Sequence, residues 1–278
     1  FKQKTAYEIY QCDWSSDVCS SDLLTEAVRG HAFSLVFATV SGAHLYGFPS
    51  ADSDWDLRGA HVLPLAEVLG LREGPGTWSL ERDDGVVELD LVTHDARKFA
   101  GLLLKRNGYV LEQLLSPLVV HSSAAHAALV ALAPGVLTRH HAAHYLGFTV
   151  NQWRLLEKEA ATPAGPRVKP LLYAFRTVLT GLHLLRTGEV EANLGALNAG
   201  ARLPFLEDLM ALKQSGREAE PLPEPLDVYR AAHRRLLAEL EAAPLSTPLP
   251  DAVPDAAQRS VSDWVVQVCL GALPLTAR

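Results

Sequence analysis

The stretch FSLVFATVSGAHLYGFPSADSDWDLRG, residues 33–59, decides the fold that this sequence predicts. Its first part, residues 33–40, is rich in β-branched and aromatic side chains, which is typical of a buried strand. The small residues Ser41–Gly42–Ala43 follow directly and predict a tight turn. Residues 52–63 then alternate in polarity and predict a second strand. The stretch therefore predicts a strand, a turn and another strand.

The second strand carries charged side chains on one of its faces. Because successive side chains of a strand point to opposite faces, Asp54, Asp56 and Arg58 are expected to share one face. Residues 85–94, GVVELDLVTH, predict a third strand in which Glu88 and Asp90 share a face. If the two acidic strands are neighbours in a sheet, their carboxylates converge.

The rest of the chain is mostly helical in its pattern. Apolar residues recur at helical spacing after the third strand and through most of the second half. The predicted helices cover residues 95–108, 122–133, 138–158, 168–187 and 225–243. Residues 243–258 are rich in proline and predict an extended segment.

This pattern predicts an α+β fold with two parts. A small mixed β-sheet with flanking helices is expected over residues 24–118, and an all-α helical part over residues 119–278. Residues 1–23 have neither the charged nor the apolar region of a signal peptide. We interpret them as a non-native segment of the kind that an adaptor sequence adds to an open reading frame.

Composition restricts the partners and the compartment. The 278 residues carry a formal net charge of −7, so no global basic field attracts nucleic acid or an anionic membrane. The sequence has no apolar run long enough for a transmembrane helix, and membrane binding is not expected. The three cysteines form no disulfide framework, which favours the reducing cytoplasm.

Three converging carboxylates favour a divalent cation. Unpaired, Asp54, Asp56 and Asp90 would raise one another's pKa. A hard cation such as Mg²⁺ removes this cost and keeps coordination places for substrate phosphates. Two ions, with Mn²⁺ as a substitute, could activate a hydroxyl and neutralise a leaving pyrophosphate. Backbone N–H groups at a glycine turn, here around Gly42, can hold phosphate oxygens.

These residues resemble the polymerase-beta nucleotidyltransferase superfamily. The stretch YGFPSADSDWDLRG, followed by LDLVTHDARKFAGLLLKRNGYVLEQLLSP, is similar to the predicted nucleotidyltransferases of that superfamily that accompany RNA-repair ligases. The resemblance implies Mg²⁺-dependent transfer of a nucleoside monophosphate from a nucleoside triphosphate, with ATP as the expected donor, to an acceptor hydroxyl. It implies that Asp54, Asp56 and Asp90 are the catalytic metal ligands. Glu88 competes with Asp90 for the third place.

The resemblance also implies a nucleotide site. Gly42 would be the turn glycine that binds the triphosphate, with Ser41 and Ala43 beside it. The superfamily usually has serine directly after this glycine, so Ala43 removes a hydroxyl unless Ser41 replaces it. Such families also carry a helix with lysine and arginine beside the nucleotide.

Three basic side chains are candidates for phosphate contacts. Lys169, Tyr173 and Arg176 lie at helical spacing and form one stripe, which the resemblance assigns to the nucleotide. A solvated basic face is the alternative. Arg58 is expected to point to the acidic face, where it could hold a phosphate, orient Asp90 or neutralise the acids.

Other functions remain open at this point. A non-catalytic nucleotide- or metal-binding module, regulatory or antitoxin-like, is favoured by Ala43. A glycosyltransferase could use Asp-x-Asp but leaves the turn and Asp90 unexplained. An EF-hand fails because, counted from Asp52, the sixth position is Leu57. A zinc site at His140 and His144 lacks a third ligand.

The acceptor is not determined by the sequence. An RNA end, a protein side chain and a small molecule are all compatible with it.

Overall fold

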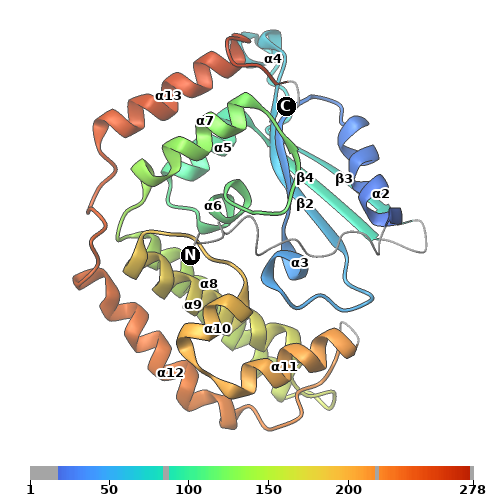
Figure 1. The fold of residues 1–278 in the computed structure, drawn as a ribbon, viewed down its shortest axis with the longest axis vertical. Coiled ribbons are helices and arrows are strands. Elements are labelled where there is room, and N and C mark those ends of the chain that lie inside the picture. The colour runs from blue at the N-terminus through green and yellow to red at the C-terminus, as the bar shows by residue number, and fades with distance from the viewer. Residues whose placement is uncertain (1–17, 84–87, 217–218, 276–278) are drawn as a thin grey trace, which may run out of the picture.

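The fold is a mixed five-stranded sheet with helices on both faces, followed by a helical part (Figure 1). It was obtained as a computed structural model that describes residues 18–83, 88–216 and 219–275. This architecture confirms the predicted α+β class. Within the described residues, no helix combines the length and apolarity needed to cross a membrane.

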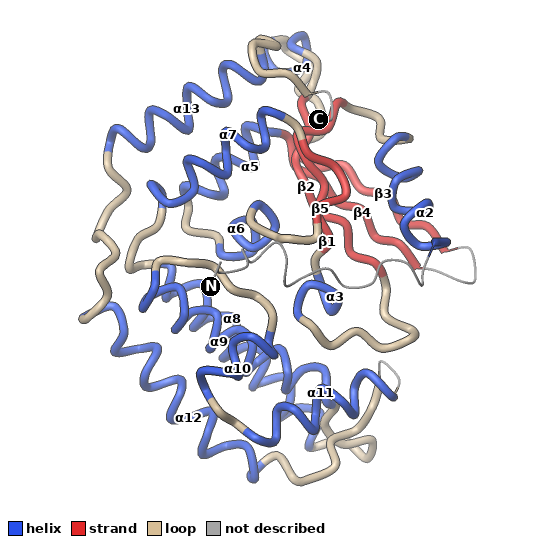
Figure 2. The backbone as a smooth tube through the Cα atoms, in the orientation of Figure 1, coloured by secondary structure: helices blue, strands red, loops and turns tan. Residues whose placement is uncertain are grey.

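The sheet has the strand order β3-β4-β2-β1-β5. Its strands are β1 (Ser34–Val40), β2 (Trp55–Val62), β3 (Thr77–Asp83), β4 (Glu88–Asp95) and β5 (Val119–Ser122). The pairing of β2 with β4 is parallel, and the other three pairings are antiparallel. Figure 2 shows the strands as one twisted layer. The two acidic strands, β2 and β4, are therefore neighbours, which is the condition for their carboxylates to converge.

The central position of β1 explains its apolar sequence. Both its edges are paired and every residue after Ser34 is buried, so a continuous apolar run is required. β4 instead buries alternate residues, among them Leu89 and Leu91, and leaves Asp90 half-buried on the other face.

Helices cover the two faces of the sheet unequally. On one face lies α2 (Val18–Arg29), over a small apolar cluster that includes Leu24, Leu57 and Leu91. Helices α5 (Ala96–Leu104), α6 (Gly108–Leu114) and α7 (Ala124–Leu132) lie on the other. The short helices are α3 (Gly42–Tyr46) and α4 (Leu65–Leu69).

The helical part is built around two long helices that pack against each other, α8 (His141–Ala160) and α9 (Val168–Thr187). Around them lie α10 (Leu194–Ala201), α11 (Pro204–Ser215) and α12 (Asp227–Ala242). The last helix, α13 (Asp255–Cys269), returns to pack on α5 and α7 (Figure 1).

One large apolar core joins the two parts. It contains Phe37 and Phe99 from the sheet and α5 together with Leu171 and Phe175 from α9. The sheet also takes its fifth strand, β5, from beyond residue 118, where the helical part was expected to begin. Helix α2 includes the last residues of the segment 1–23, and residues 1–17 lie outside the described part.

Several local predictions need correction. Strands β3 and β5 and helices α10 and α11 were not predicted. The segment 243–258 is not extended throughout, because α13 begins at Asp255. The strand expected at 85–94 is β4 from Glu88 onward, with residues 85–87 outside the described part.

Candidate active site: an arginine-bridged carboxylate pair beside a glycine turn

The parallel pairing of β2 with β4 places Asp56 directly beside Asp90. Glu88 lies opposite Asp83 of β3. In the β2–β4 pairing the residue opposite Asp56 is Asp90, and not Glu88. Nη2 of Arg58 lies between the two carboxylates. It donates to Oδ1 of Asp56 at 2.5 Å and to Oδ2 of Asp90 at 2.7 Å.

The other terminal nitrogen fixes Arg58 to the main chain. Nη1 donates to the carbonyl oxygens of Leu57 at 2.9 Å and of Asp90 at 2.6 Å. The Arg58 side chain is 20% exposed, and those of Asp56 and Asp90 are 19% and 34% exposed. The three side chains of the cluster are thus only partly buried.

The glycine turn contacts Asp56 directly. Gly42 has φ +62°, and a Cβ atom built on it would lie 1.9 Å from Oδ2 of Asp56. The N–H of Ser41 donates to the carbonyl oxygen of Asp56 at 2.8 Å. Ser41 and Ala43 are buried. The turn can therefore approach the carboxylate only because residue 42 lacks a side chain.

The electrostatics of Asp56 show which charges surround it. Burial raises the pKa of Asp56 to about 6, the charge of Arg58 opposes this, and Asp54 and Asp90 raise the pKa further. Lys169, on α9, acts in the opposite direction to the neighbouring acids. Asp54, Arg58, Asp90 and Lys169 thus all act electrostatically on Asp56.

The donor set fits a hard divalent cation in its chemistry. It consists of carboxylate oxygens whose negative charge is only partly balanced, next to a backbone turn that a Cβ would fill. Among the residues that the structure describes, however, no three His, Cys, Asp or Glu side chains form a ready ligand group. Arg58 stands between two of the predicted ligands.

Comparison with known proteins decides the family. Residues 18–267 match the family described as "RlaP: RNA repair pathway DNA polymerase beta family". The chain belongs to this family. The match covers both the sheet and most of the helical part, so the polymerase-beta resemblance of the sequence is confirmed.

Two curated relatives are themselves described as uncharacterized. The protein MJ0002 of Methanocaldococcus jannaschii is 29% identical over 166 residues, which is 58% of this chain and 64% of the relative. The protein YcgL of Bacillus subtilis is 32% identical over 108 residues, which is 37% of this chain and 38% of the relative. The chain thus spans less than two thirds of either relative in these matches.

Arg176 has two well-defined partners inside the protein. It is 1% exposed, and its Nη1 donates to Oε2 of Glu112 at 3.0 Å. Its guanidinium stacks on the Tyr46 ring with Cζ 3.7 Å from the centroid. The observed partners of Arg176 are therefore internal, and one of them, Tyr46, belongs to α3, the helix that begins at Gly42.

Sequence reasoning missed Glu112. This residue of α6 is 3% exposed, and burial raises its pKa while Arg176 lowers it. Its signal in the sequence is a single acid inside the apolar run YVLEQLL, which is typical of a buried ion pair. The pair connects α6 to α9 and so joins the sheet part to the helical part.

The histidines that the sequence analysis considered have local contacts in the structure. His140 pairs with Asp251 at 3.0 Å, and burial lowers the pKa of His144 to about 4. No metal-holding group of three such side chains includes them in the described ranges. His44 stacks on Trp55, with ring centroids 3.8 Å apart.

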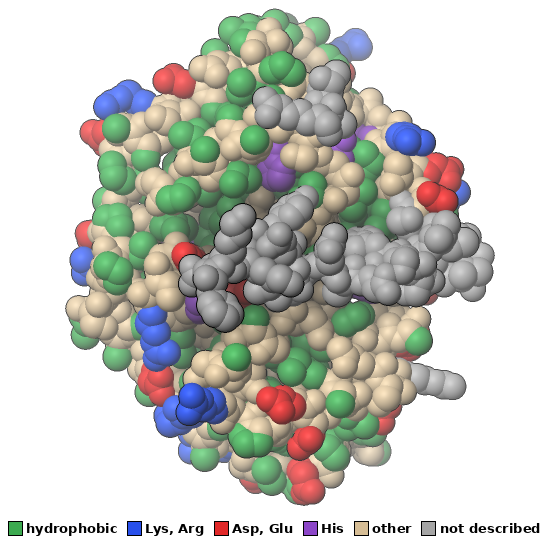
Figure 3. All heavy atoms as spheres, viewed as in Figure 1, with side chains coloured by type: hydrophobic (Ala, Val, Ile, Leu, Met, Phe, Trp, Pro, Cys, Tyr) green, Lys and Arg blue, Asp and Glu red, His purple; other side chains and the backbone are tan. Residues whose placement is uncertain are grey.

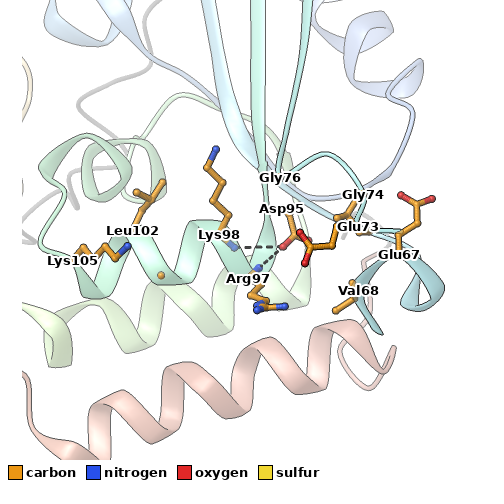
Figure 4. Close-up of a pocket in the computed structure, with 12 residues that line it drawn as sticks. Glu67, Val68, Glu73, Gly74, Gly76, Asp95, Arg97, Lys98, Leu102 and Lys105 are labelled. Carbon is orange, nitrogen blue, oxygen red and sulfur yellow. Dashed lines mark hydrogen bonds between the residues drawn. The ribbon is translucent and has the colours of Figure 1, made fainter. Parts of the chain in front are cut away.

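A cavity of about 470 Å³ lies elsewhere, beside the carboxyl ends of β2 and β4. Figure 4 shows Asp95 at its wall, where its Oδ2 accepts from the N–H groups of Arg97 and Lys98 and caps α5. The cavity contains none of the predicted site residues. On the face in Figure 3, basic and acidic side chains are scattered among each other.

Proposed function

We propose that this protein is a Mg²⁺-dependent nucleotidyltransferase that moves a nucleoside monophosphate from a nucleoside triphosphate to an acceptor hydroxyl. Membership of the RNA repair pathway DNA polymerase beta family supports the reaction class. The single observation that carries the assignment to this site is the Asp56–Asp90 pair in parallel register beside Gly42.

Asp54, Asp56 and Asp90 would hold the metal ions. When bound, two such ions lower the pKa of the acceptor hydroxyl and neutralise charge on the leaving group. Asp90 assists removal of the hydroxyl proton. The acceptor oxygen bonds to the α-phosphorus, and the bond from that phosphorus to the oxygen bridging to the β-phosphate breaks, which releases pyrophosphate.

The remaining groups of the site bind and orient the triphosphate. The turn Ser41–Gly42–Ala43 places backbone groups next to Asp56, and Lys169 brings a positive charge from α9. Catalysis then consists of positioning and charge neutralisation. ATP is the donor we propose to test first, and an RNA end is the first acceptor because of the family description. We propose the cytoplasm as the compartment.

The test is transfer of label from α-³²P-ATP, with Mg²⁺ or Mn²⁺, to RNA ends, to protein or to small hydroxyl compounds. We expect D56N and D90N to lose turnover by at least about a hundredfold and to remain folded. E88Q is the matched control, because Glu88 lies on the same strand and is exposed. Equal labelling by wild type, D56N and D90N would exclude this site from catalysis.

A second candidate is a nucleotide- or metal-binding regulatory module. The observation in its favour is Ala43, which is 3% exposed and offers no hydroxyl to a phosphate. Calorimetry that detects ATP binding together with no pyrophosphate release for any acceptor would favour this candidate.

A further inference from the structure

Arg58 donates hydrogen bonds to carboxylate oxygens of Asp56 and Asp90 that would otherwise be free to bind a metal ion. A single nitrogen, Nη2, donates to Asp56 and to Asp90. An oxygen lone pair that accepts from a guanidinium is not available to a cation in the same direction. A metal–oxygen distance of about 2.0–2.1 Å would also bring a divalent ion close to the Arg58 charge. A lone divalent ion must therefore compete with Arg58.

A triphosphate at the neighbouring turn changes this competition. Asp56 contacts both Arg58 and Gly42, so phosphate oxygens held at the turn would lie beside the guanidinium. Guanidinium groups bind phosphate oxygens with paired hydrogen bonds. The two carbonyl bonds of Nη1 keep Arg58 at the site while Nη2 changes partner.

We propose that Arg58 acts as an internal counter-cation and, by donating Nη2 to Asp56 and Asp90, prevents a lone divalent ion from binding these two carboxylates. When a triphosphate binds, its oxygens accept the hydrogen bonds of Nη2 instead, and the carboxylates become available to the metal ion. This proposal rests on the proposed function, since it assumes that these carboxylates hold metal. Metal and nucleotide then bind cooperatively. By linkage, each increases the affinity of the site for the other.

The experiment is a titration of the whole chain of this sequence with Mn²⁺ alone, in which electron paramagnetic resonance measures the concentration of the free ion. The variants are R58M, which keeps the stem, and R58Q, which keeps a neutral donor. We expect both to bind Mn²⁺ at least about tenfold more tightly than wild type, because one competing positive charge is gone. The melting temperature should rise more on Mn²⁺ addition in these variants than in wild type.

The matched control is R82M, which removes an arginine of β3 that pairs with Glu26 at 3.5 Å. Its Mn²⁺ affinity should equal that of wild type. The double variant D56N/R58M should not bind Mn²⁺ more tightly than wild type, because the Asp56 carboxylate that R58M makes available is absent. If wild type binds Mn²⁺ as tightly as R58M and R58Q, the inference on Arg58 is overturned and the proposed function stands. If wild type and R58M both lack Mn²⁺ binding, with and without a non-hydrolysable ATP analogue, the proposed function fails as well.

Discussion

The carboxylate of Asp56 fills the space that a side chain at residue 42 would need. A Cβ atom on Gly42 would lie 1.9 Å from Oδ2 and 2.9 Å from Cγ of Asp56, and the backbone there has φ +62°. The glycine and the acid are therefore packed as a unit. Any larger residue at position 42 must displace the predicted metal ligand.

The variant G42A tests this contact. We expect it to lose about 1–3 kcal/mol of unfolding free energy through backbone strain and to lose most of its activity, because Asp56 moves. G147A is the control, since Gly147 lies inside α8 with nothing near its Cβ position. It should gain up to about 1 kcal/mol. Denaturant unfolding measures both, and a G42A protein as stable and active as wild type would disprove the contact.

The raised pKa of Asp56 predicts how stability depends on pH. The folded pKa is about 6 and the ordinary value is 3.8, so the folded state binds the proton more tightly than the unfolded state. The stabilisation of the folded state by its protonated Asp56 is complete below pH 3.8 and is lost as the pH rises through 6. It amounts to about 2–3 kcal/mol at 1.36 kcal/mol per pKa unit.

D56N removes that dependence. Wild type loses this stabilisation between pH 4.5 and pH 7.5 and D56N does not, so the unfolding free energy of D56N should increase relative to that of wild type by about 2–3 kcal/mol over this range. Urea unfolding at several pH values measures the difference. A constant difference across this range would show that Asp56 titrates normally.

For the buried ion pair between Glu112 and Arg176, we expect removal of one partner to cost much more stability than removal of both. E112Q leaves the Arg176 charge buried without its partner, and we expect a loss of about 3–5 kcal/mol. The double variant E112M/R176M should recover most of this loss, because no charge stays behind.

The exposed pair Arg186–Glu239 is the control for E112Q. R186Q should change stability by less than about 1 kcal/mol. Chemical denaturation compares the variants. Equal effects of E112Q and R186Q would mean that burial adds nothing to the inner pair.

Lys169 is expected to act on the nucleotide. K169M should weaken binding of the triphosphate by about tenfold or more, because a charge-assisted contact near Asp56 is lost. It should also raise the pKa of Asp56, which Lys169 lowers. K158M, on an exposed position of α8, should leave both unchanged. Calorimetry with an ATP analogue measures the affinities, and equal values for K169M and K158M would remove Lys169 from the site.

The sequence predicted the centre of the fold better than its edges. Strand β1 is paired on both sides and must be apolar, and β2 and β4 alternate, so periodicity found all three. Strand β5 has only four residues, and β3 is mostly exposed at the edge of the sheet. Short or exposed strands bury too little to leave a pattern in the sequence.

The carboxylates and the glycine of the site were named from the sequence, because local spacing and the family resemblance indicate them. Contacts between residues far apart in the sequence could not be predicted in the same way. Spacing on α9 put Lys169 and Arg176 in one stripe, but it could not show that Arg176 pairs with the buried Glu112 of α6 while Lys169 acts electrostatically on Asp56. Likewise, the sequence left open whether Arg58 holds a phosphate, orients Asp90 or neutralises the acids, because its contacts depend on the register of β2 with β4.

That register has an evolutionary consequence. Asp56 and Asp90 are held together by main-chain bonds between strands rather than by the turn that follows β2. We therefore expect insertions at residues 71–72, between α4 and β3, to leave the Asp56–Asp90 pairing unchanged. The nearby Leu69 and Leu71 are 75% and 107% exposed, so substitutions at these two positions should be tolerated during evolution.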